Sequence, residues 1–463
     1  MPGLRGVIRG SQEPLERDWT EASLIADRRD LHRHPETGWT EFRTTAIVVE
    51  RLRALGYSPL LGADVCQAAS RRGVPDPEAL DAAWSRARAE GVDGDLLETM
   101  RGGMTGAVAL RRWGRGPVVA LRFDMDALDL MESEAATHRP LREGFASVHK
   151  GICHACGHDG HVAIGLGVAH ALARSKHSLQ GTLKLIFQPA EEGVRGARSI
   201  VEAGHLDDVD IVVGCHVLTG WALGELAPGL GGYAATRKLD VLFRGEAAHA
   251  GGMPEGGRNA LLAAATAAVH LHALPRHHAG FTRVHVGRLT AGSGRNVIPE
   301  QALLVAEVRG ETMELCAFMA ERALAVVTAA ASMYGCTVEV RPMGEAGTAR
   351  SDPDLARRIE HVASAVGDFH CFAVDAVGGS EDFTEMMLHV QERGGMAAYV
   401  GLGADLTGVH RDDADRSRVL AAHTSTFDFD ERVLGGAVSL LSGLVVDVLG
   451  GVSPRSERSD VDT

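Results

Sequence analysis

The amino-acid sequence predicts an α/β protein in which a smaller domain is inserted into a larger one. Three observations lead to this fold class. Strand-like and helix-like segments alternate between about residues 105 and 217, which is typical of a largely parallel sheet covered by helices. From about residue 233 the order changes to βαββαβ, the pattern of a ferredoxin-like unit. The alternating pattern returns at about residue 348.

The first part of the larger domain is expected over residues 1–232. It begins with a helix over 18–56, and the polar, alanine-rich stretch at about 62–104 suggests a helical insertion. The segments "TGAVALRR" and "VVALRFDMDA" are predicted to form a pair of strands, because both are rich in β-branched residues and the turn "WGRGP" separates them. Further along, the pattern indicates helices at 161–177 and 196–206 and strands at 181–189 and 209–217.

The inserted domain is expected over residues 233–346. Its antiparallel sheet should carry helices on one face. The predicted elements are strands at 236–245, 282–290, 301–310 and 336–344 and helices at 259–274 and 311–333. The larger domain then resumes over 347–452, with a helix at 352–366 and a last helix from Asp430, and the polar tail 453–463 is predicted to be disordered.

Composition narrows the possible functions. Hydrophobic residues make up 45% and charged residues 23% of the 463 residues, values typical of globular domains. The most apolar segment, "GGAVSLLSGLVVDVLGGV", contains Asp447 and is interpreted as a buried helix, so no membrane span is expected. A net charge of −14 without a basic stripe argues against nucleic acid or an anionic membrane as partner, while a small anionic substrate is still allowed.

The expected compartment follows from the cysteines and the N-terminus. Seven scattered cysteines, an odd number, do not resemble a disulfide framework. The first residues, "MPGLRGVIRGSQEPLERDW", contain no apolar region of a secretory signal. A reducing cytoplasm is therefore the simplest location.

The stretch "GICHACGHDGH" at 151–161 contains the first candidate metal ligands. Cys156 and His158 lie two residues apart just before a helix, and thiolate and imidazole are both good ligands for zinc-like ions. Glu191 and Glu192 in "FQPAEEG" follow a buried strand, where sites in α/β sheets usually lie. Adjacent carboxylates point in different directions, so one can bind a metal while the other transfers protons. An incidental Cys-x-His and a solvated acidic loop are the structural alternatives.

Two histidines extend this set. His216 ends another predicted strand, and His423 precedes the last helix. Together with the earlier residues they come from four separate elements and offer more donors than one tetrahedral ion needs, which suggests two ions. Asp124 and Asp126 in "FDMDAL" end a strand as well and could ligate a metal, orient a ligand histidine, or simply cap a turn.

The sequence resembles the di-metal aminoacylase and carboxypeptidase superfamily, in the branch that contains hippurate hydrolase and the auxin-conjugate hydrolases. The matching segments occur in family order and cover nearly the whole chain: "LHRHPETGW", "DMDAL", "HACGHDGHV", "FQPAEEG", "GCHV", "AAHAGGMPEGGRNALLAAA", "GSGRNVIP", "GSEDF" and "HTSTFDFDE". This resemblance implies a di-metal peptidase-like catalytic domain with an inserted lid and dimerisation domain. It also implies two divalent ions, manganese or zinc, held by Cys156, His158, Glu192, His216 and His423.

The resemblance also implies roles around the metal centre. Glu191 would be the general base, with Asp159 supporting the ligands from the start of its helix. His249 in "AAHAGG" resembles a histidine that reaches into the partner's site in family dimers and stabilises the oxyanion. Arg295 and Asn296 in "GSGRNVIP" are the candidates for holding the substrate. Three further cations of the inserted domain could do the same or be surface residues: Arg237, Lys238 and Arg309.

The function implied is that of a metal-dependent amidohydrolase. Its expected substrate is an N-aroyl or N-acyl amino acid, first p-aminobenzoyl-glutamate, with indole-3-acetyl-aspartate or another acyl-aspartate as the close alternative. The working unit is expected to be a homodimer or a heteromer in which a related B subunit takes part. The alternative from another class is a non-catalytic partner protein that keeps only the fold, and a redox role for Cys153 and Cys156 is a further one.

Overall fold

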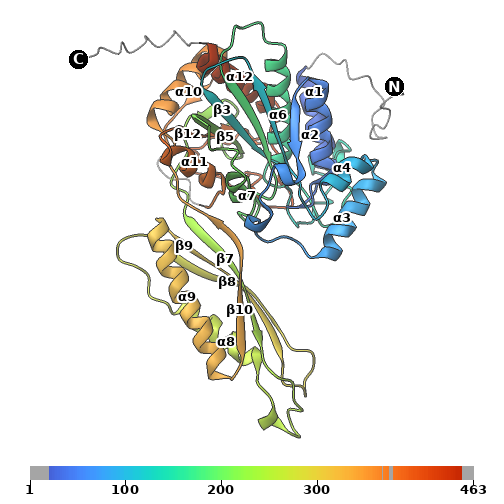
Figure 1. Cartoon of the computed structure of the whole chain (residues 1–463), viewed down its shortest axis with the longest axis vertical. Coiled ribbons are helices and arrows are strands. Elements are labelled where there is room, and N and C mark those ends of the chain that lie inside the picture. The colour runs from blue at the N-terminus through green and yellow to red at the C-terminus, as the bar shows by residue number, and fades with distance from the viewer. Residues whose placement is uncertain (1–19, 368, 375–378, 451–463) are drawn as a thin grey trace, which may run out of the picture.

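The computed structural model describes residues 20–367, 369–374 and 379–450 and contains a larger domain and an elongated inserted domain (Figure 1). The predicted tail at 453–463 lies outside the described residues. The elements of the larger domain are α1 (Glu21–Arg33), α2 (Phe42–Ala54), β1 (Ser58–Leu61), η1 (Gly62–Asp64), η2 (Ala68–Ser70), α3 (Pro77–Ala89), α4 (Gly94–Thr99), β2 (Ala107–Arg112), β3 (Val118–Asp124), α5 (Arg139–Arg142), α6 (His158–Ala173), β4 (Thr182–Gln188), α7 (Ala197–Glu202), β5 (Ile211–Leu218), β6 (Glu225–Ala227), α10 (Pro353–Val366), β11 (His370–Cys371), α11 (Phe383–Glu392), β12 (Met396–Gly403) and α12 (Val433–Gly450).

The larger domain is built on one eight-stranded sheet, in the order β1-β2-β4-β3-β5-β12-β6-β11. Its central strands β4, β3, β5 and β12 are parallel. Helices α1, α2, α6, α10 and α12 cover one face, and α7 and α11 cover the other (Figure 1). Side chains alternate accordingly: Leu121 packs under the first group and Ala120 under the second. The sheet is therefore buried on both faces, which confirms the α/β class.

Two predictions about this domain were wrong. The expected single helix over 18–56 is two helices, because Pro35 has no N–H to donate and disfavours helical backbone at the preceding residue. The expected strand pair β2 and β3 is separated by β4, which runs antiparallel to β2 and parallel to β3. The turn between β2 and β3 thus connects two strands that are not neighbours.

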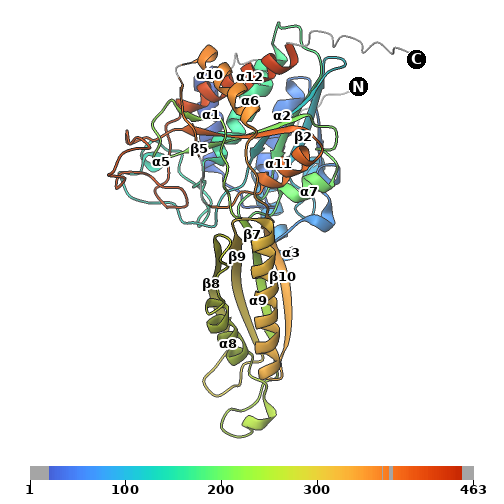
Figure 2. The same cartoon turned by 90° about the vertical axis from the view of Figure 1, so that its left-hand side faces the viewer.

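The inserted domain has the predicted βαββαβ order. Its elements are β7 (Ala235–Arg244), η3 (Pro254–Gly256), α8 (Ala260–His272), β8 (Thr282–Ala291), β9 (Gln301–Gly310), α9 (Met313–Met333) and β10 (Thr337–Ala346). The strands form an antiparallel sheet in the order β10-β7-β9-β8, and α8 and α9 pack on one of its faces (Figure 2). The other face of this sheet is turned away from the helices, so α8 and α9 do not cover the side chains there and these side chains can line a cavity.

Two helices, α9 and α12, are long and apolar enough to cross a membrane by length and composition alone. Met319, Ala323 and Val327 of α9 belong to the core of the inserted domain. Leu440, Leu441 and Leu444 of α12 belong to the core of the larger domain, as predicted for that buried segment. These six apolar side chains are thus covered by the protein itself.

Candidate metal centre

The candidate ligands meet at the carboxyl edge of the central parallel strands. β3 and β5 run in parallel, and His216 lies near the end of β5. Glu191 and Glu192 follow β4, and His158 is the first residue of α6. Gly157, with φ +89, lies in the left-handed region and turns the chain between Cys156 and the helix. Strand polarity therefore brings residues far apart in the sequence to one edge of the sheet.

Distances show that these side chains form a single cluster. Cys156 Sγ lies 3.5 Å from His216 Nε2, and His423 Nε2 lies 3.4 Å from Glu192 Oε1. Three groups of donor atoms each lie within 4.8 Å of one another: Cys156, His158 and His216; Cys156, Glu192 and His423; His158, Glu191 and Glu192. The first two groups share Cys156, and together they contain all five residues predicted to bind metal.

The donor atoms of this cluster suit divalent cations. Both ring nitrogens of His158 and Oε1 of Glu192 are buried without a hydrogen-bond partner in the described part of the chain. His216 donates from Nδ1 to the carbonyl of Val217, 2.7 Å away, so its Nε2 is the nitrogen that faces Cys156. Buried polar atoms without partners are costly, and metal coordination would satisfy them. A thiol, three imidazoles and a carboxylate are ligands that zinc and similar ions accept.

Buried carboxylates hold the loop that carries the two glutamates. Asp126 accepts the backbone N–H groups of Glu191, at 3.0 Å, and Glu192, at 2.9 Å. Glu41 accepts the N–H of Ala190 at 2.8 Å. Ala190 has φ +54, in the left-handed region that a residue with a Cβ rarely adopts. The loop is therefore kept in an unfavourable backbone conformation by hydrogen bonds to buried carboxyl groups, as is common at functional sites. His423, with φ +62, has the same kind of backbone.

Sequence reasoning missed a second group of charges next to Glu191. Arg122 is fully buried and donates to Asp124 at 2.5 Å, Glu381 at 3.1 Å and Asp382 at 3.2 Å. Burial and the charge of Glu381 raise the pKa of Glu191 well above its usual range. The segment "GSEDF" belongs to the family resemblance, but nothing local in it indicates that its carboxylates contact an arginine on β3.

The supporting residues divide into two sets. His161 donates from Nδ1 to Asp124 at 2.5 Å and accepts the N–H of Val217 at Nε2, so it ties α6 to β5. Asp126 Oδ1 lies 3.4 Å from His158 Nδ1, close to a candidate ligand. Asp159 instead accepts from Arg28 and His32, each at 2.8 Å, so its carboxylate contacts these residues of α1.

The predicted residues of the inserted domain lie far from this cluster. β7 leaves the larger domain and runs outward, so the loops after β7 and between β8 and β9 form the distal end (Figure 1). His249 and Asn296 belong to these loops, and the N–H of Ala250 bonds the carbonyl of Asn296 at 2.9 Å. A ten-residue strand spans about 30 Å. His249, Arg295 and Asn296 are thus not brought to the candidate metal ligands of their own chain.

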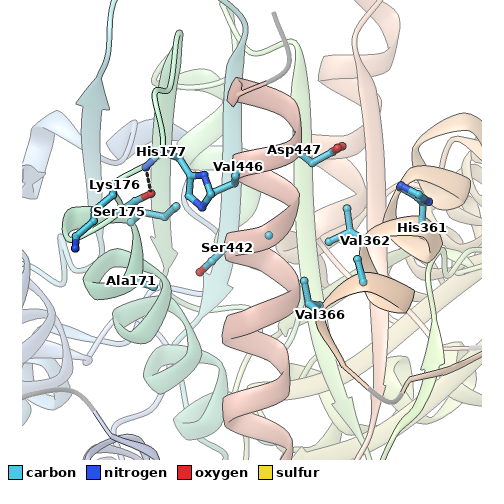
Figure 3. A pocket seen from close by; sticks show the side chains of 13 residues that line it. Ala171, Ser175, Lys176, His177, His361, Val362, Val366, Ser442, Val446 and Asp447 are labelled. Carbon is cyan, nitrogen blue, oxygen red and sulfur yellow. Dashed lines mark hydrogen bonds between the residues drawn. The ribbon is translucent and has the colours of Figure 1, made fainter.

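Two cavities differ in their relation to the cluster. One, of about 550 Å³, lies between the two domains and is lined by Glu192, His423, Arg195 and Lys238. The other, of about 580 Å³, lies between the carboxyl-terminal halves of α6, α10 and α12 and contains none of the predicted site residues (Figure 3). Because the candidate ligands lie at the opposite end of α6, the inter-domain cavity is the one next to the cluster.

Residues 120–422 match the peptidase family M20/M25/M40. The chain belongs to this family. The indole-3-acetyl-aspartic acid hydrolase of Enterobacter agglomerans is 48% identical over 419 residues, 90% of this chain and 93% of that protein. The A subunit of the p-aminobenzoyl-glutamate hydrolase of Escherichia coli (strain K12) is 47% identical over 418 residues, again 90% and 93% of the two chains.

Solved structures agree with this family assignment. An aminobenzoyl-glutamate utilization protein from Klebsiella pneumoniae has a TM-score of 0.78 and 42% identity, covering 92% of this chain and 95% of that one. A Bacillus subtilis protein described as a dinuclear metal binding peptidase from the M20 family has a TM-score of 0.61 and 25% identity, covering 93% and 99%. Membership confirms the predicted fold and the predicted class: the protein is a metal-dependent amidohydrolase that cleaves amides of N-acyl amino acids.

Proposed function

We propose that this amidohydrolase cleaves p-aminobenzoyl-glutamate to p-aminobenzoate and glutamate. The proposal rests on the observation that five candidate metal ligands lie close together around Glu191: Cys156, His158, Glu192, His216 and His423. Indole-3-acetyl-aspartate is the second candidate, because relatives that act on the two conjugates are 47% and 48% identical to this chain. Both conjugates join an aromatic acyl group to an acidic amino acid.

The five clustered residues would hold two divalent cations. The thiol and imidazoles favour zinc, while manganese is the other ion expected from the family resemblance. When bound, such ions polarise an amide carbonyl and allow water to ionise near neutral pH. The ring nitrogens of His158 and Oε1 of Glu192, which are buried without a hydrogen-bond partner among the described residues, support this role.

Glu191 would move the proton. Its side chain is buried, 4.0 Å from His158, and belongs to a group of donors with Glu192, so it faces the same space as the ligands. A carboxylate there can take a proton from the attacking water and return it to the departing amine nitrogen. Its raised pKa makes this carboxylate a stronger base for the first step.

His249 would act on the site of a neighbouring protomer. The N–H of Gly252 donates to His249 Nδ1 at 2.9 Å, which leaves Nε2 as the protonated nitrogen, able to donate to an oxyanion. Its place at the distal end of the inserted domain supports a working homodimer, or a heteromer with a related B subunit, in which Arg295 and Asn296 also contact the substrate. The Escherichia coli relative is itself named as one of the subunits of its enzyme. We place the protein in the cytoplasm, which suits its seven free cysteines.

A hydrolysis panel tests the proposal. The full-length protein, reconstituted with Mn²⁺ or Zn²⁺, is assayed on p-aminobenzoyl-glutamate, indole-3-acetyl-aspartate and hippurate, with metal content measured in parallel. We expect about two ions per chain, the highest kcat/KM on p-aminobenzoyl-glutamate, and loss of activity on chelation that added metal restores. A protein that binds metal but cleaves none of the three would contradict the proposal, as would clear preference for hippurate.

The role of Glu191 has its own test. The Glu191→Gln variant keeps the shape of the side chain but cannot accept the proton, so we expect kcat to fall by about 10²- to 10⁴-fold with metal content unchanged. Substantial activity at full metal occupancy would show that another group is the base. Gln67→Glu, a change at an exposed loop residue, serves as the control for handling and folding.

A further inference from the structure

The cavity between the two domains has an uneven distribution of charge. It is lined by Glu192 and His423 from the metal cluster and, across from them, by Lys238 and His285 on the open face of the inserted sheet. Leu128 and Val305 add apolar surface. A molecule in this cavity would therefore contact the candidate ligands on the larger domain and a lysine on the inserted domain.

Lys238 is a cation without a carboxylate partner in the part of the chain that the structure describes. It is half-buried on β7, close enough to His423 for its charge to oppose protonation of that ring. Its neighbour Arg237 lies on the opposite face, where its charge acts on Cys316 of α9. Side chains alternate along a strand, so Lys238 and not Arg237 lines the cavity.

Arg195 is the second cation of the cavity. Its Nε donates to the carbonyl of Glu192 at 2.7 Å, and its Nη1 donates to the carbonyl of Gly73 at 3.0 Å. These bonds fix the guanidinium on the wall of the larger domain without neutralising it, because backbone carbonyls carry no net charge. Among the described residues no carboxylate forms an ion pair with it.

The acidic groups of the cavity do not cancel these cations. Glu307 is held by Arg309 through bonds of 2.9 and 3.1 Å. Asp240 lies near the charges of Arg288 and Arg341. Glu192 is a candidate metal ligand, so its charge would be taken up by the ions. Asp129 also lines the cavity, but it is exposed and forms no ion pair with either cation among the described residues. Lys238 and Arg195 therefore keep positive charge that is available to an anion.

We infer that Lys238, assisted by Arg195, binds the side-chain carboxylate of the substrate's acidic amino acid. This subsite deepens the proposed function and rests on it, since it assumes that N-acyl amino acids enter the inter-domain cavity. It selects glutamate and aspartate conjugates over neutral ones, because a half-buried lysine facing a neutral side chain would be left without a partner. Hippurate, whose glycine has no side-chain carboxylate, cannot use it.

A pair of substrates that differ by one charge tests this subsite. The metal-loaded full-length protein is assayed on p-aminobenzoyl-glutamate and on p-aminobenzoyl-glutamine, in which an amide replaces the side-chain carboxylate. For Lys238→Met we expect kcat/KM on the glutamate conjugate to fall roughly 10- to 100-fold, mainly through KM, with little change on the glutamine conjugate. Lys238→Arg should retain most of the preference, and Arg237→Met, on the opposite face, should leave both substrates unaffected.

A binding measurement keeps this test independent of turnover. Glutamate and glutamine are titrated calorimetrically into the metal-loaded wild-type and Lys238→Met proteins, and only glutamate binding should weaken in the variant. The subsite would be overturned if Lys238→Met lost kcat/KM equally on both conjugates and affinity equally for both ligands. It would also be overturned if the variant lost neither kcat/KM on the glutamate conjugate nor affinity for glutamate. If the wild-type protein cleaves no amide but binds glutamate through Lys238, the proposed function fails while the subsite stands.

Discussion

Replacing Asp126 by asparagine tests how the loop of the two glutamates is held. The two carboxylate oxygens of Asp126 accept the N–H groups of Glu191 and Glu192, at 3.0 and 2.9 Å. In Asp126→Asn one of these oxygens becomes an NH₂ group that faces an N–H donor. One charge-assisted bond is lost, and one buried amide is left without an acceptor.

The expected cost is about 3 kcal/mol of unfolding free energy, from one lost charge-assisted bond and the desolvation of an unpaired amide. The substitution also removes the negative charge of Asp126 from beside Glu41, but the stabilisation gained from this is small. Burial and the charge of Asp126 raise the pKa of Glu41 to about 8, so at neutral pH Glu41 is mostly protonated and little repulsion is relieved. Because the loop positions Glu192, metal affinity should fall about 10- to 100-fold as well.

Urea unfolding of the metal-free variant gives the stability change, and competition with a chelator gives the metal affinity. Asp129→Asn is the matched control, since Asp129 is three residues away, lines the inter-domain cavity and is exposed. If Asp126→Asn unfolds at the same urea concentration as the wild type and binds metal equally well, Asp126 does not hold the loop and the reasoning is wrong.

Two further predictions concern buried groups near the cluster. Arg122→Met leaves three carboxylates buried without their guanidinium and should lower the unfolding free energy by about 3–5 kcal/mol in urea titrations, whereas Arg115→Met on an exposed turn should have no such effect. Burial lowers the pKa of His154 to about 3, so between about pH 6.5 and 3 the unfolded chain binds a proton that the folded chain does not, and stability falls as the pH falls through this window. By pH 5 this effect lowers the unfolding free energy by about 2 kcal/mol. In urea titrations the unfolding free energy of His154→Phe should therefore fall by about 2 kcal/mol less than that of the wild type between neutral pH and pH 5. An equal fall in the two proteins would contradict the prediction.

Much of this protein could be predicted from local patterns in its sequence. The βαββαβ order of the inserted domain follows from a change in hydrophobic periodicity, which each segment carries within itself. The candidate ligands Cys156, Glu192 and His216 were recognisable because Cys156 precedes a segment with a clear helix pattern and the other two follow or end segments with a clear strand pattern. Residue type and strand polarity together are enough to predict a metal cluster at the carboxyl edge of a parallel sheet.

Tertiary structure alone decided which distant residues meet. No local signal indicates that β4 inserts between β2 and β3, because strand pairing depends on the packing of the whole sheet. The contact of Arg122 with Glu381 joins residues 259 positions apart. Lys238 and His249 lie on the same inserted domain, yet the first lines the cavity beside the candidate metal ligands and the second lies at the distal end. The spacing of hydrophobic residues within one helix or strand shows which of its faces is buried. The partners of a charged side chain depend instead on which elements pack together, and no local sequence pattern encodes that.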